Sequence, residues 1–292
     1  MRFLSLLSLL FAFTLPAFAA KRTSVTIGYN LAERREYVEA NGKRLSDYVK
    51  KKIGLEVKTY VAKDYAALVD MLKAGKLDFA FFPPFSLVKA EESAGAHLLL
   101  KAVRRGRDVS YGAIIVRADS PYRKVEDLKG KKMGWVDAQS ATGYLIPKAD
   151  LISKLKLEPD SFLGKQSFLR THDALVKAVL DGQVDAGATW VNDPEGKSGA
   201  WHRHVKSAEQ SAQIRMIHVT APLPGDALAT TGRLWKSEKA MVEQVTKVLQ
   251  RMGEALDGQQ ILRDLYGIDK MVPAAPKDFD PVRTAAKVVG EK

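Results

Sequence analysis

The same arrangement of residue types occurs once in each half of this sequence, and this repeat constrains the fold more than any other feature. Residues 65–80 and 172–187 both begin with a helical pattern, reach a glycine and, after two intervening residues, place an aspartate before a short apolar run. A glycine directly after a helical pattern is a typical helix end. A short apolar run is expected of a strand that helices cover on both faces. The repeat therefore predicts two similar α/β lobes.

Strands and helices are expected to alternate along both halves, which predicts mainly parallel sheets with helices on both sides. Alternating or β-branched residues mark the strands, and apolar residues at helical spacing mark the helices. The expected strands are Ser24–Asn30, Leu55–Val61, Asp78–Phe82, Tyr111–Ala118, Lys132–Val136, Ser167–Leu169, Asp185–Trp190 and Ile214–Thr220. The expected helices are Glu33–Ile53, Asp64–Leu72, Phe85–Ser93, Thr142–Leu155, Thr171–Leu180 and the segment from Glu238 onward.

The first residues have the layout of a secretory signal peptide. Arg2 carries positive charge, residues 3–15 are apolar, and residues 17–19 read Ala-Phe-Ala, as a signal peptidase requires. The apolar stretch is shorter than the roughly 20 residues of a membrane-spanning helix, which disfavours the alternative of an uncleaved anchor. We expect export to the periplasm and cleavage near Ala19.

Composition excludes several function classes. The absence of cysteine removes disulfides, thiolate metal sites and cysteine nucleophiles. The net charge of +12 would suit a nucleic-acid-binding protein, but the signal peptide conflicts with that alternative. His202 and His204 have no cluster of acidic partners, whereas structural metal sites use about four ligands. No phosphate-loop, dinucleotide, hydrolase or zinc-protease motif is present. We therefore expect no catalytic group, no metal, no cofactor and no nucleic-acid partner.

The segment around Ser140, Thr142 and Gly143 is the most informative candidate site. It follows an expected strand and opens an expected helix, so hydroxyl groups and free backbone N–H groups would face one point there. The helix dipole favours an anion at such a point. The alternative is that Ser140 or Thr142 only caps the helix.

Five further candidate residues each have an ordinary structural alternative. Ser86 follows a Pro-Pro pair at a helix start and offers a hydroxyl, unless the pair only ends the strand. His172 could donate to an oxyanion or be a solvated imidazole at a helix end. Tyr65 and Tyr111 could cover a ligand, or pack in the core. Asp226 could meet a titratable ligand group or be a turn residue.

Taken together, these segments resemble the periplasmic phosphonate-, phosphite- and phosphate-binding proteins of ABC importers, the PhnD-like family. The resemblance extends from Ser24 to about Tyr266. The segments that carry it are Asp64–Val69, Asp78–Ser86, Asp127–Gly130 and Ser140–Pro147.

The resemblance implies roles for individual residues. In that family the corresponding loop holds phosphonate oxygens, a role that falls here on Ser140, Thr142 and the Gly143 backbone. The family's pocket tyrosines, histidine and acidic residue resemble Tyr65 and Tyr111, His172 and Asp226. Two departures are visible: Ala141 replaces a hydroxyl residue, and Trp190 and Asn192 stand where aminophosphonate binders place a glutamate. Trp190 and Asn192 are therefore also candidate ligand-binding residues.

The fold implied is α/β, the two-lobed type II periplasmic binding protein fold, in which each lobe is a mainly parallel sheet flanked by helices and two strands form the hinge. Lobe 1 would comprise residues 20–113 and 220–292, and lobe 2 residues 114–219. The chain would cross between the lobes near Ile115 and His218.

The function implied is that of the soluble binding component of an ABC importer. It would bind a small anionic ligand (a phosphonate, phosphite or phosphate) in the cleft between the lobes, act as a monomer, and deliver the ligand to an inner-membrane permease. A ligand such as a sulfonate on the same fold is the alternative. An exported enzyme acting on phosphorus esters is less consistent with the sequence, which shows neither a nucleophile–base pair nor a metal cluster.

Overall fold

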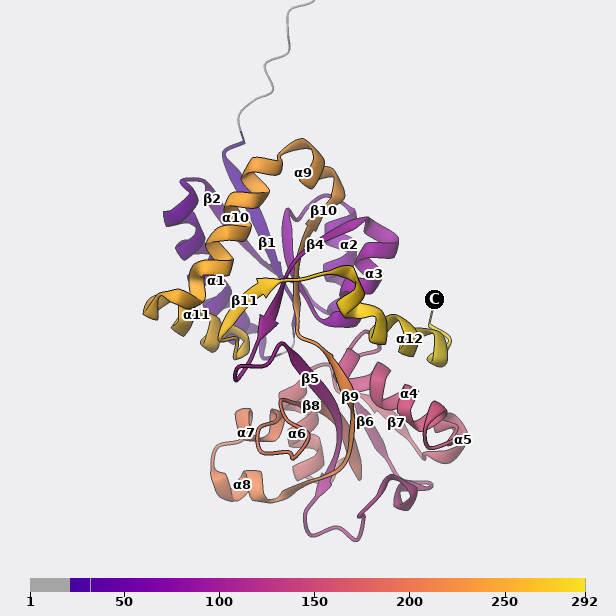
Figure 1. The fold of residues 1–292 in the computed structure, drawn as a ribbon. Coiled ribbons are helices and arrows are strands. Elements are labelled where there is room, and N and C mark those ends of the chain that lie inside the picture. The colour runs from indigo at the N-terminus through magenta and orange to yellow at the C-terminus, as the bar shows by residue number, and fades with distance from the viewer. Residues whose placement is uncertain (1–21, 32, 292) are drawn as a thin grey trace, which may run out of the picture.

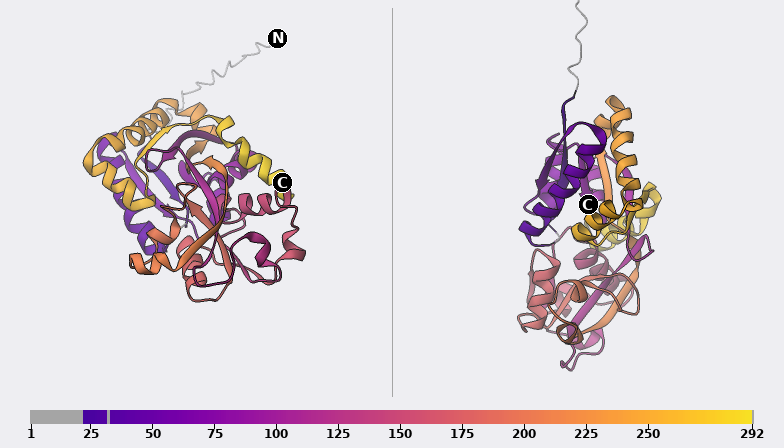
Figure 2. Two further views of the ribbon diagram at one scale, coloured as in Figure 1. Left: turned by 60° about the horizontal axis from the view of Figure 1, so that its bottom comes forward. Right: turned by 90° about the vertical axis from the view of Figure 1, so that its left-hand side faces the viewer.

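The computed structural model describes residues 22–31 and 33–291. They form two α/β lobes, an upper and a lower one in Figure 1, each built around one sheet. The right-hand view of Figure 2 shows the same division from the side. The predicted signal peptide lies outside the described residues. Among the residues that are described, no helix is both long enough and apolar enough to cross a membrane.

The sheet of the upper lobe has six strands with helices on both faces. In spatial order its strands are β11 (Lys270–Pro273), β4 (Ala96–Val103), β10 (Ala227–Thr231), β3 (Phe79–Phe82), β1 (Ser24–Tyr29) and β2 (Glu56–Val61). One face packs against α1 (Arg35–Ile53), α10 (Lys239–Arg251) and α11 (Leu256–Tyr266), and the other against α2 (Tyr65–Lys73) and α3 (Pro84–Ala94). The shorter elements are α9 (Gly232–Ser237), η3 (Met252–Glu254) and η4 (Pro276–Phe279).

The sheet of the lower lobe has five strands. In spatial order they are β7 (Gln166–Phe168), β6 (Met133–Trp135), β8 (Ala186–Val191), β5 (Val109–Arg117) and β9 (Ile214–Pro224). Its helical elements are η1 (Val125–Leu128), η2 (Ala141–Leu145), α4 (Ile146–Ser153), α5 (Pro159–Phe162), α6 (His172–Leu180), α7 (Ala200–Arg203) and α8 (Ala208–Ala212). The π-helical turn η2 runs directly into α4, so that residues 141–153 form one continuous helical segment.

The two-lobed architecture is confirmed, but both sheets are mixed rather than mainly parallel. β10 lies antiparallel between β3 and β4, and β5 is antiparallel to both β8 and β9. The chain path explains the direction of β10. The chain returns from the lower lobe to the upper sheet beside the carboxyl end of β3, so β10 runs opposite to β3. The sequence does not predict β4, β10 or β11. β10 is buried throughout and β4 contains three consecutive leucines, so neither shows the strict alternation of apolar and polar residues that marks a half-buried strand, and β11 is only four residues long.

The chain is expected to cross between the lobes near Ile115 and His218. In the structure the two crossings lie in the loops between strands instead. β4 ends at Val103 and β5 begins at Val109, while β9 ends at Pro224 and β10 begins at Ala227. Ile115 of β5 and His218 of β9 instead lie well inside the lower sheet, where these two strands pair. The division into lobes at residues 113/114 and 219/220 stays a prediction.

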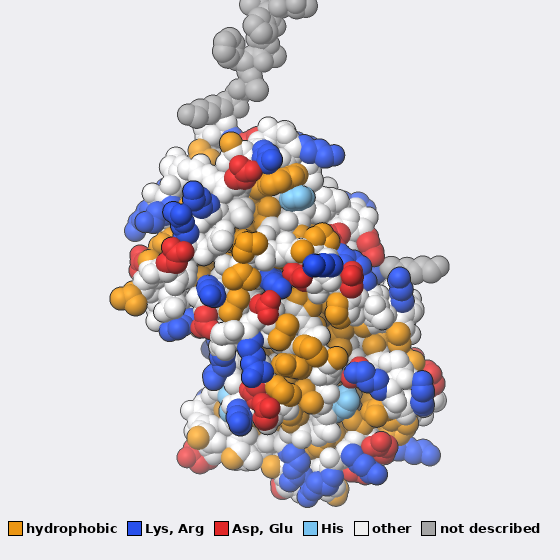
Figure 3. Space-filling view, viewed as in Figure 1, with side chains coloured by type: hydrophobic (Ala, Val, Ile, Leu, Met, Phe, Trp, Pro, Cys, Tyr) orange, Lys and Arg blue, Asp and Glu red, His pale blue; other side chains and the backbone are white. Residues whose placement is uncertain are grey.

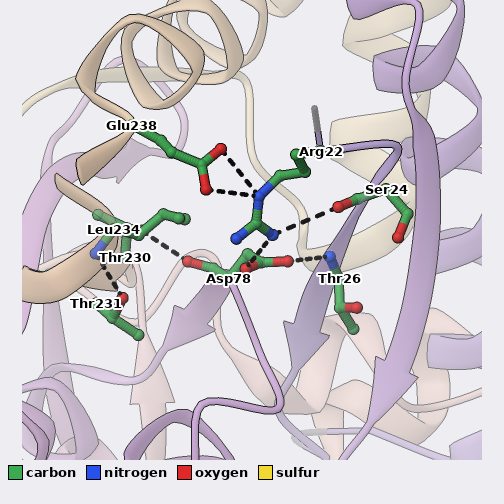
Figure 4. Close-up of polar contacts among 8 residues, drawn as sticks. All are labelled: Arg22, Ser24, Thr26, Asp78, Thr230, Thr231, Leu234 and Glu238. Atoms are coloured by element: carbon green, nitrogen blue, oxygen red, sulfur yellow. Dashed lines mark hydrogen bonds and ion pairs between the residues drawn. The ribbon is translucent and has the colours of Figure 1, made fainter. Parts of the chain in front are cut away.

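Asp78, the aspartate that precedes the apolar strand β3, joins this strand to its neighbour β1. As Figure 4 shows, its carboxylate accepts hydrogen bonds from the Arg22 guanidinium (2.8 Å) and from the backbone N–H of Thr26 (2.8 Å), near the start of the adjacent strand β1. Glu238 holds the other side of the same guanidinium, at 3.0 Å. In the lower lobe Asp185 likewise accepts the N–H of Lys132, just before the adjacent strand β6, at 2.8 Å. The repeated aspartate therefore ties each apolar strand to the start of its parallel neighbour.

The C-terminal helix α12 (Asp280–Val289) connects the lobes a third time. It leaves the upper lobe and lies beside α3 and α4, as Figure 1 shows. Its buried residues Val282 and Ala286, and Phe279 just before it, belong to the same apolar cluster as Leu145 and Ile146 of the lower lobe. The core of the molecule is therefore continuous from one lobe to the other.

Candidate functional site

A cavity of about 510 Å³ lies between the two lobes. The upper lobe contributes residues at the carboxyl ends of β1 and β3, such as Asn30 and Pro83, and the start of α2 at Tyr65. The lower lobe contributes the starts of η2 and α6 and the end of β8, at Ser140, His172 and Trp190. Ligand sites of open α/β sheets lie at these carboxyl ends. The cavity is therefore the candidate ligand-binding site.

Ser140 both caps the helical segment 141–153 and lines the cavity. Its Oγ accepts the backbone N–H of Gly143 at 3.0 Å, so the capping alternative for this residue is part of the structure. The Ser140 hydroxyl hydrogen is still available to a ligand. Ala141 and Thr142 also line the cavity. Their N–H groups belong to the first helical turn, where a backbone donor has no partner within the helix.

Gly143 is turned away from the cavity, unlike its neighbours. Its N–H is occupied by Ser140, and a Cβ at this position would lie only 2.6 Å from Val136. Such a distance leaves no room for a side chain. The absence of a side chain thus lets the helix start pack closely on the end of β6, and Gly143 supports the loop from behind.

His172 lies at the cavity wall as a buried, neutral imidazole. Its side chain is the first of α6, beside the capping residue Thr171, and its Nδ1 lies 2.8 Å from Thr189 Oγ1. Burial lowers the pKa of His172 to about 3, and the nearby His204 adds to the effect. The ring of Trp190 stands edge-on to it, with centroids 6.4 Å apart. His172 can therefore donate one hydrogen bond without carrying charge.

The two candidate tyrosines lie in different places. Tyr65 is buried at the start of α2 and lines the cavity, and burial raises the pKa of its phenol well above the usual value. It is therefore a neutral hydroxyl group. Tyr111 on β5 pairs with Val191 of β8 and Pro222 of β9, packs against the apolar cluster of the lower lobe, and does not line the cavity.

Ser86 and Asp226 differ from the free groups that the sequence suggests. Ser86 is fully buried in the first turn of α3, outside the cavity lining, and its hydroxyl has no hydrogen-bond partner. Asp226 lines the cavity but forms an ion pair of 2.5 Å with Arg104. Arg104 also donates to the carbonyl of Tyr266, at 2.9 Å. The charge of Asp226 is thus neutralised by protein.

Several cavity residues come from segments in which the sequence shows no site. Glu33 pairs with Arg203 across the two lobes at 2.7 Å, and Arg263 pairs with Asp269 at 3.3 Å. Burial raises the pKa of Glu33 although Arg203 opposes that shift. Asn30 is the exception that the sequence could have indicated, because it stands at the carboxyl end of the first expected strand.

The histidine pair 202 and 204 is arranged for packing and hydrogen bonding. His202 Nδ1 accepts the N–H of Gly199 at 3.0 Å, and burial lowers the pKa of His204 to about 4. Within residues 22–31 and 33–291, no group of three or more histidine, cysteine or acidic side chains is placed to hold a metal ion.

The positive net charge is not gathered into one basic surface on the face of Figure 3. Acidic side chains lie among the basic ones, including where the two lobes meet. Inside the cavity the arginine-to-carboxylate pairs repeat this pattern. Arg105 also lines the cavity and forms no ion pair within the described residues, so the lining carries one positive charge that no carboxylate offsets.

Residues 27–279 match the family model described as the periplasmic substrate-binding protein of the phosphonate ABC transporter. The chain belongs to this family. The predicted resemblance is confirmed, as is the expectation of a binding-protein family rather than an enzyme family. The family is periplasmic, whereas cleavage near Ala19 stays a prediction.

Three relatives illustrate the match. The chain is 33% identical over 175 residues to the phosphate-import protein PhnD of Mycolicibacterium smegmatis, covering 56% of this chain and 54% of that protein. It is 24% identical over 196 residues to the phosphonates-binding periplasmic protein of Escherichia coli, covering 65% and 56%. The chain thus spans little more than half the length of these relatives. PhnD1 from Prochlorococcus marinus, solved with methylphosphonate, superposes with a TM-score of 0.79 at 18% identity, over 92% of this chain and 99% of that one. It confirms the fold.

Proposed function

We propose that this protein is the substrate-binding component of an ABC importer and that it binds a small phosphorus oxyanion, foremost a phosphonate, in the cavity between its lobes. The observation that carries the proposal is the start of the helical segment 141–153, which opens into this cavity with Ser140 and Thr142 on its rim. Free N–H groups at a helix start bind phosphoryl oxygens well. The family and the phosphorus ligands in the names of the relatives support the same ligand class.

The neutral donors around the helix start complete the proposed anion site. Tyr65 from the upper lobe and His172 from the lower lobe both line the cavity, and both are uncharged at neutral pH. Neutral donors in a buried site hold a doubly charged oxyanion without adding ion pairs that would need desolvation.

Ligand contacts on both lobes suggest how binding is signalled. A ligand that touches the helix start of the lower lobe and Tyr65 of the upper lobe favours the closed arrangement over an open one. The closed monomer would then dock on an inner-membrane permease in the periplasm.

The first test is a thermal-shift titration of protein purified free of phosphate. The ligands are methylphosphonate, phosphite, phosphate, sulfate and an alkylsulfonate. A ligand at about 100 times its dissociation constant stabilises the folded state by about 2.7 kcal/mol, which raises the melting temperature by several degrees. A shift with a phosphorus anion alone supports the proposal. A shift confined to the sulfonate would replace the ligand class, and no shift with any of them would remove the proposal.

The second test substitutes the rim of the anion site. Ser140→Ala and Thr142→Ala should each weaken phosphonate binding by about 1–3 kcal/mol, the usual cost of a hydrogen bond lost in a desolvated site. Thr171→Ala is the matched control, because Thr171 caps α6 through Ala174 but does not line the cavity. Isothermal titration calorimetry should show wild-type affinity in the control. Equal affinity in all three variants would move the anion site elsewhere.

A further inference from the structure

Two buried side-chain oxygens, one from each lobe, line the cavity without a hydrogen-bond partner. Asn30 follows β1 in the upper lobe and is 1% exposed, and Asn192 follows β8 in the lower lobe and is 8% exposed. The Oδ1 atoms of both residues are unpaired. A buried acceptor without a donor costs free energy, so each of these atoms calls for a partner.

The other end of each amide has a hydrogen-bond partner, and for Asn30 that partner is a carbonyl, which only accepts and so fixes the orientation of the amide. Asn30 Nδ2 donates to the carbonyl of Phe81 at 3.3 Å, and Asn192 Nδ2 donates to Ser198 Oγ at 3.0 Å. In both residues the buried atom without a partner is the oxygen, which only accepts. A bound ligand must therefore offer donors on two sides.

An ionised phosphonate group does not supply these donors. Its oxygens accept hydrogen bonds and are expected at the start of the helical segment 141–153. The donors must come from the organic group of the ligand. The cavity of about 510 Å³ leaves room for such a group, since it falls in the range of pockets that hold organic molecules of moderate size.

The charge of the lining favours hydroxyl groups over an ammonium group as these donors. All three lining carboxylates are already paired with arginine: Glu33 with Arg203 at 2.7 Å, Asp226 with Arg104 at 2.5 Å, and Asp269 with Arg263 at 3.3 Å. An ammonium group would thus find neutral amides and nearby guanidinium groups instead of a free carboxylate. A hydroxyl group matches a neutral amide oxygen without any charge to compensate.

We infer that Asn30 and Asn192 bind hydroxyl groups on the organic part of the ligand, which makes hydroxyalkylphosphonates the preferred ligand class. This inference rests on the proposed phosphonate-binding function. The two asparagines select the organic part of the ligand, and the start of the helical segment 141–153 binds its phosphorus group.

The wild-type protein provides the first test, by calorimetry with three phosphonates of nearly equal size. They are 2-hydroxyethylphosphonate, propylphosphonate, in which a methyl group replaces the hydroxyl, and 2-aminoethylphosphonate. We expect the hydroxyl compound to bind at least about tenfold tighter than each of the others, because one well-made hydrogen bond to a buried acceptor has roughly this effect. Equal affinities, or tightest binding of the amino compound, would overturn the inference while leaving the proposed function intact. Failure of all three to bind would overturn the inference, and the thermal-shift series with methylphosphonate, phosphite and phosphate would then decide the proposed function separately.

Variants of the two asparagines provide the second test. The single hydroxyl hydrogen of 2-hydroxyethylphosphonate can bond to only one of the two acceptors, so in at least one of Asn192→Ala and Asn30→Ala its preference over propylphosphonate should fall towards equality, while propylphosphonate binding stays within about threefold of wild type. Asn41→Ala is the matched control: Asn41 is also buried, but both ends of its amide have partners, Tyr37 and Arg44, and it does not line the cavity. A preference that survives in both test variants would contradict the inference. If either variant fails to fold, the wild-type ligand series still decides it.

Discussion

At the scale of single residues, His172 makes the stability of the protein depend on pH. Its pKa is about 3 in the folded protein, because of burial, against 6.5 as the ordinary value. Between these two values the unfolded chain binds a proton that the folded protein does not, so stability decreases as the pH falls below about 6.5. At pH 5 this group alone should lower the free energy of unfolding by about 2 kcal/mol relative to pH 7.

Urea unfolding at pH 7 and pH 5 measures this effect in His172→Gln, whose side chain does not titrate. The loss of stability between the two pH values should be about 2 kcal/mol smaller in this variant than in wild type. His97→Gln is the comparison: burial also lowers the pKa of His97, but its ring, stacked on Trp235, remains partly exposed, so the change in pH dependence should be smaller than in His172→Gln. An identical pH dependence in wild type and His172→Gln would show that His172 is accessible to protons in the folded protein.

Residues of the candidate site could be predicted from the sequence only where they stand at a junction between a strand and a helix. Ser140, Thr142, Tyr65 and His172 all stand at or beside a helix start, which a strand-to-helix boundary reveals locally. Tyr111 shows the limit of that reasoning: its neighbour Ser110 lines the cavity and Tyr111 does not. Successive residues of a strand point to opposite faces, so an error of one position changes the assignment.

Cavity residues that depend on pairing across the molecule are not visible in one sequence. The ion pair of Glu33 and Arg203 joins residues from the two lobes, and no local pattern relates them. The orphan oxygens of Asn30 and Asn192 likewise follow from how the other end of each amide is used, which only coordinates show.

At the scale of elements, the repeated aspartates should contribute similarly to the two lobes. Asp78→Asn and Asp185→Asn keep the side-chain size but weaken the bonds to Thr26 and Lys132 respectively. Each should destabilise the protein by about 1–3 kcal/mol, with the larger effect at Asp78, which also holds Arg22. Thermal unfolding measures the difference, and Asp47→Asn, in an exposed pair with Lys43, should stay within about 0.5 kcal/mol of wild type.

The same two aspartates explain how far the elements could be predicted. The helix, glycine, aspartate and apolar strand follow one another along the chain, so their pattern is local and both copies are found. β4, β10 and β11 obtain their positions from strands distant in sequence. β10 is only five residues long and buried throughout, so its sequence carries no period of its own and this central antiparallel strand of the upper sheet escapes prediction.

At the scale of the whole molecule, Arg203 links the lower lobe to the upper lobe at two places. From α7 its guanidinium reaches Glu33 at 2.7 Å and the carbonyl of Asp264, in the last turn of α11, at 3.2 Å. The carbonyl end of a helix carries partial negative charge, which favours a cation. The arrangement of the lobes described here is thus held by a side chain that crosses between them in addition to the C-terminal helix α12.

Arg203→Gln should therefore shift the ligand-free protein towards a more open arrangement. Small-angle X-ray scattering without ligand should show a larger radius of gyration than wild type, since the variant leaves Glu33 buried without its cation and weakens the contact to α11. Phosphonate affinity should fall about five- to tenfold, because the ligand must then also drive closure. Arg44→Gln is the matched control: Arg44 pairs with the same residue, Asp264, at 2.6 Å, but both lie in the upper lobe. Weaker binding with an unchanged radius of gyration would mean that Arg203 acts on the ligand directly. A larger radius of gyration that returns to the wild-type value with saturating ligand would show that Arg203 sets the balance between open and closed forms.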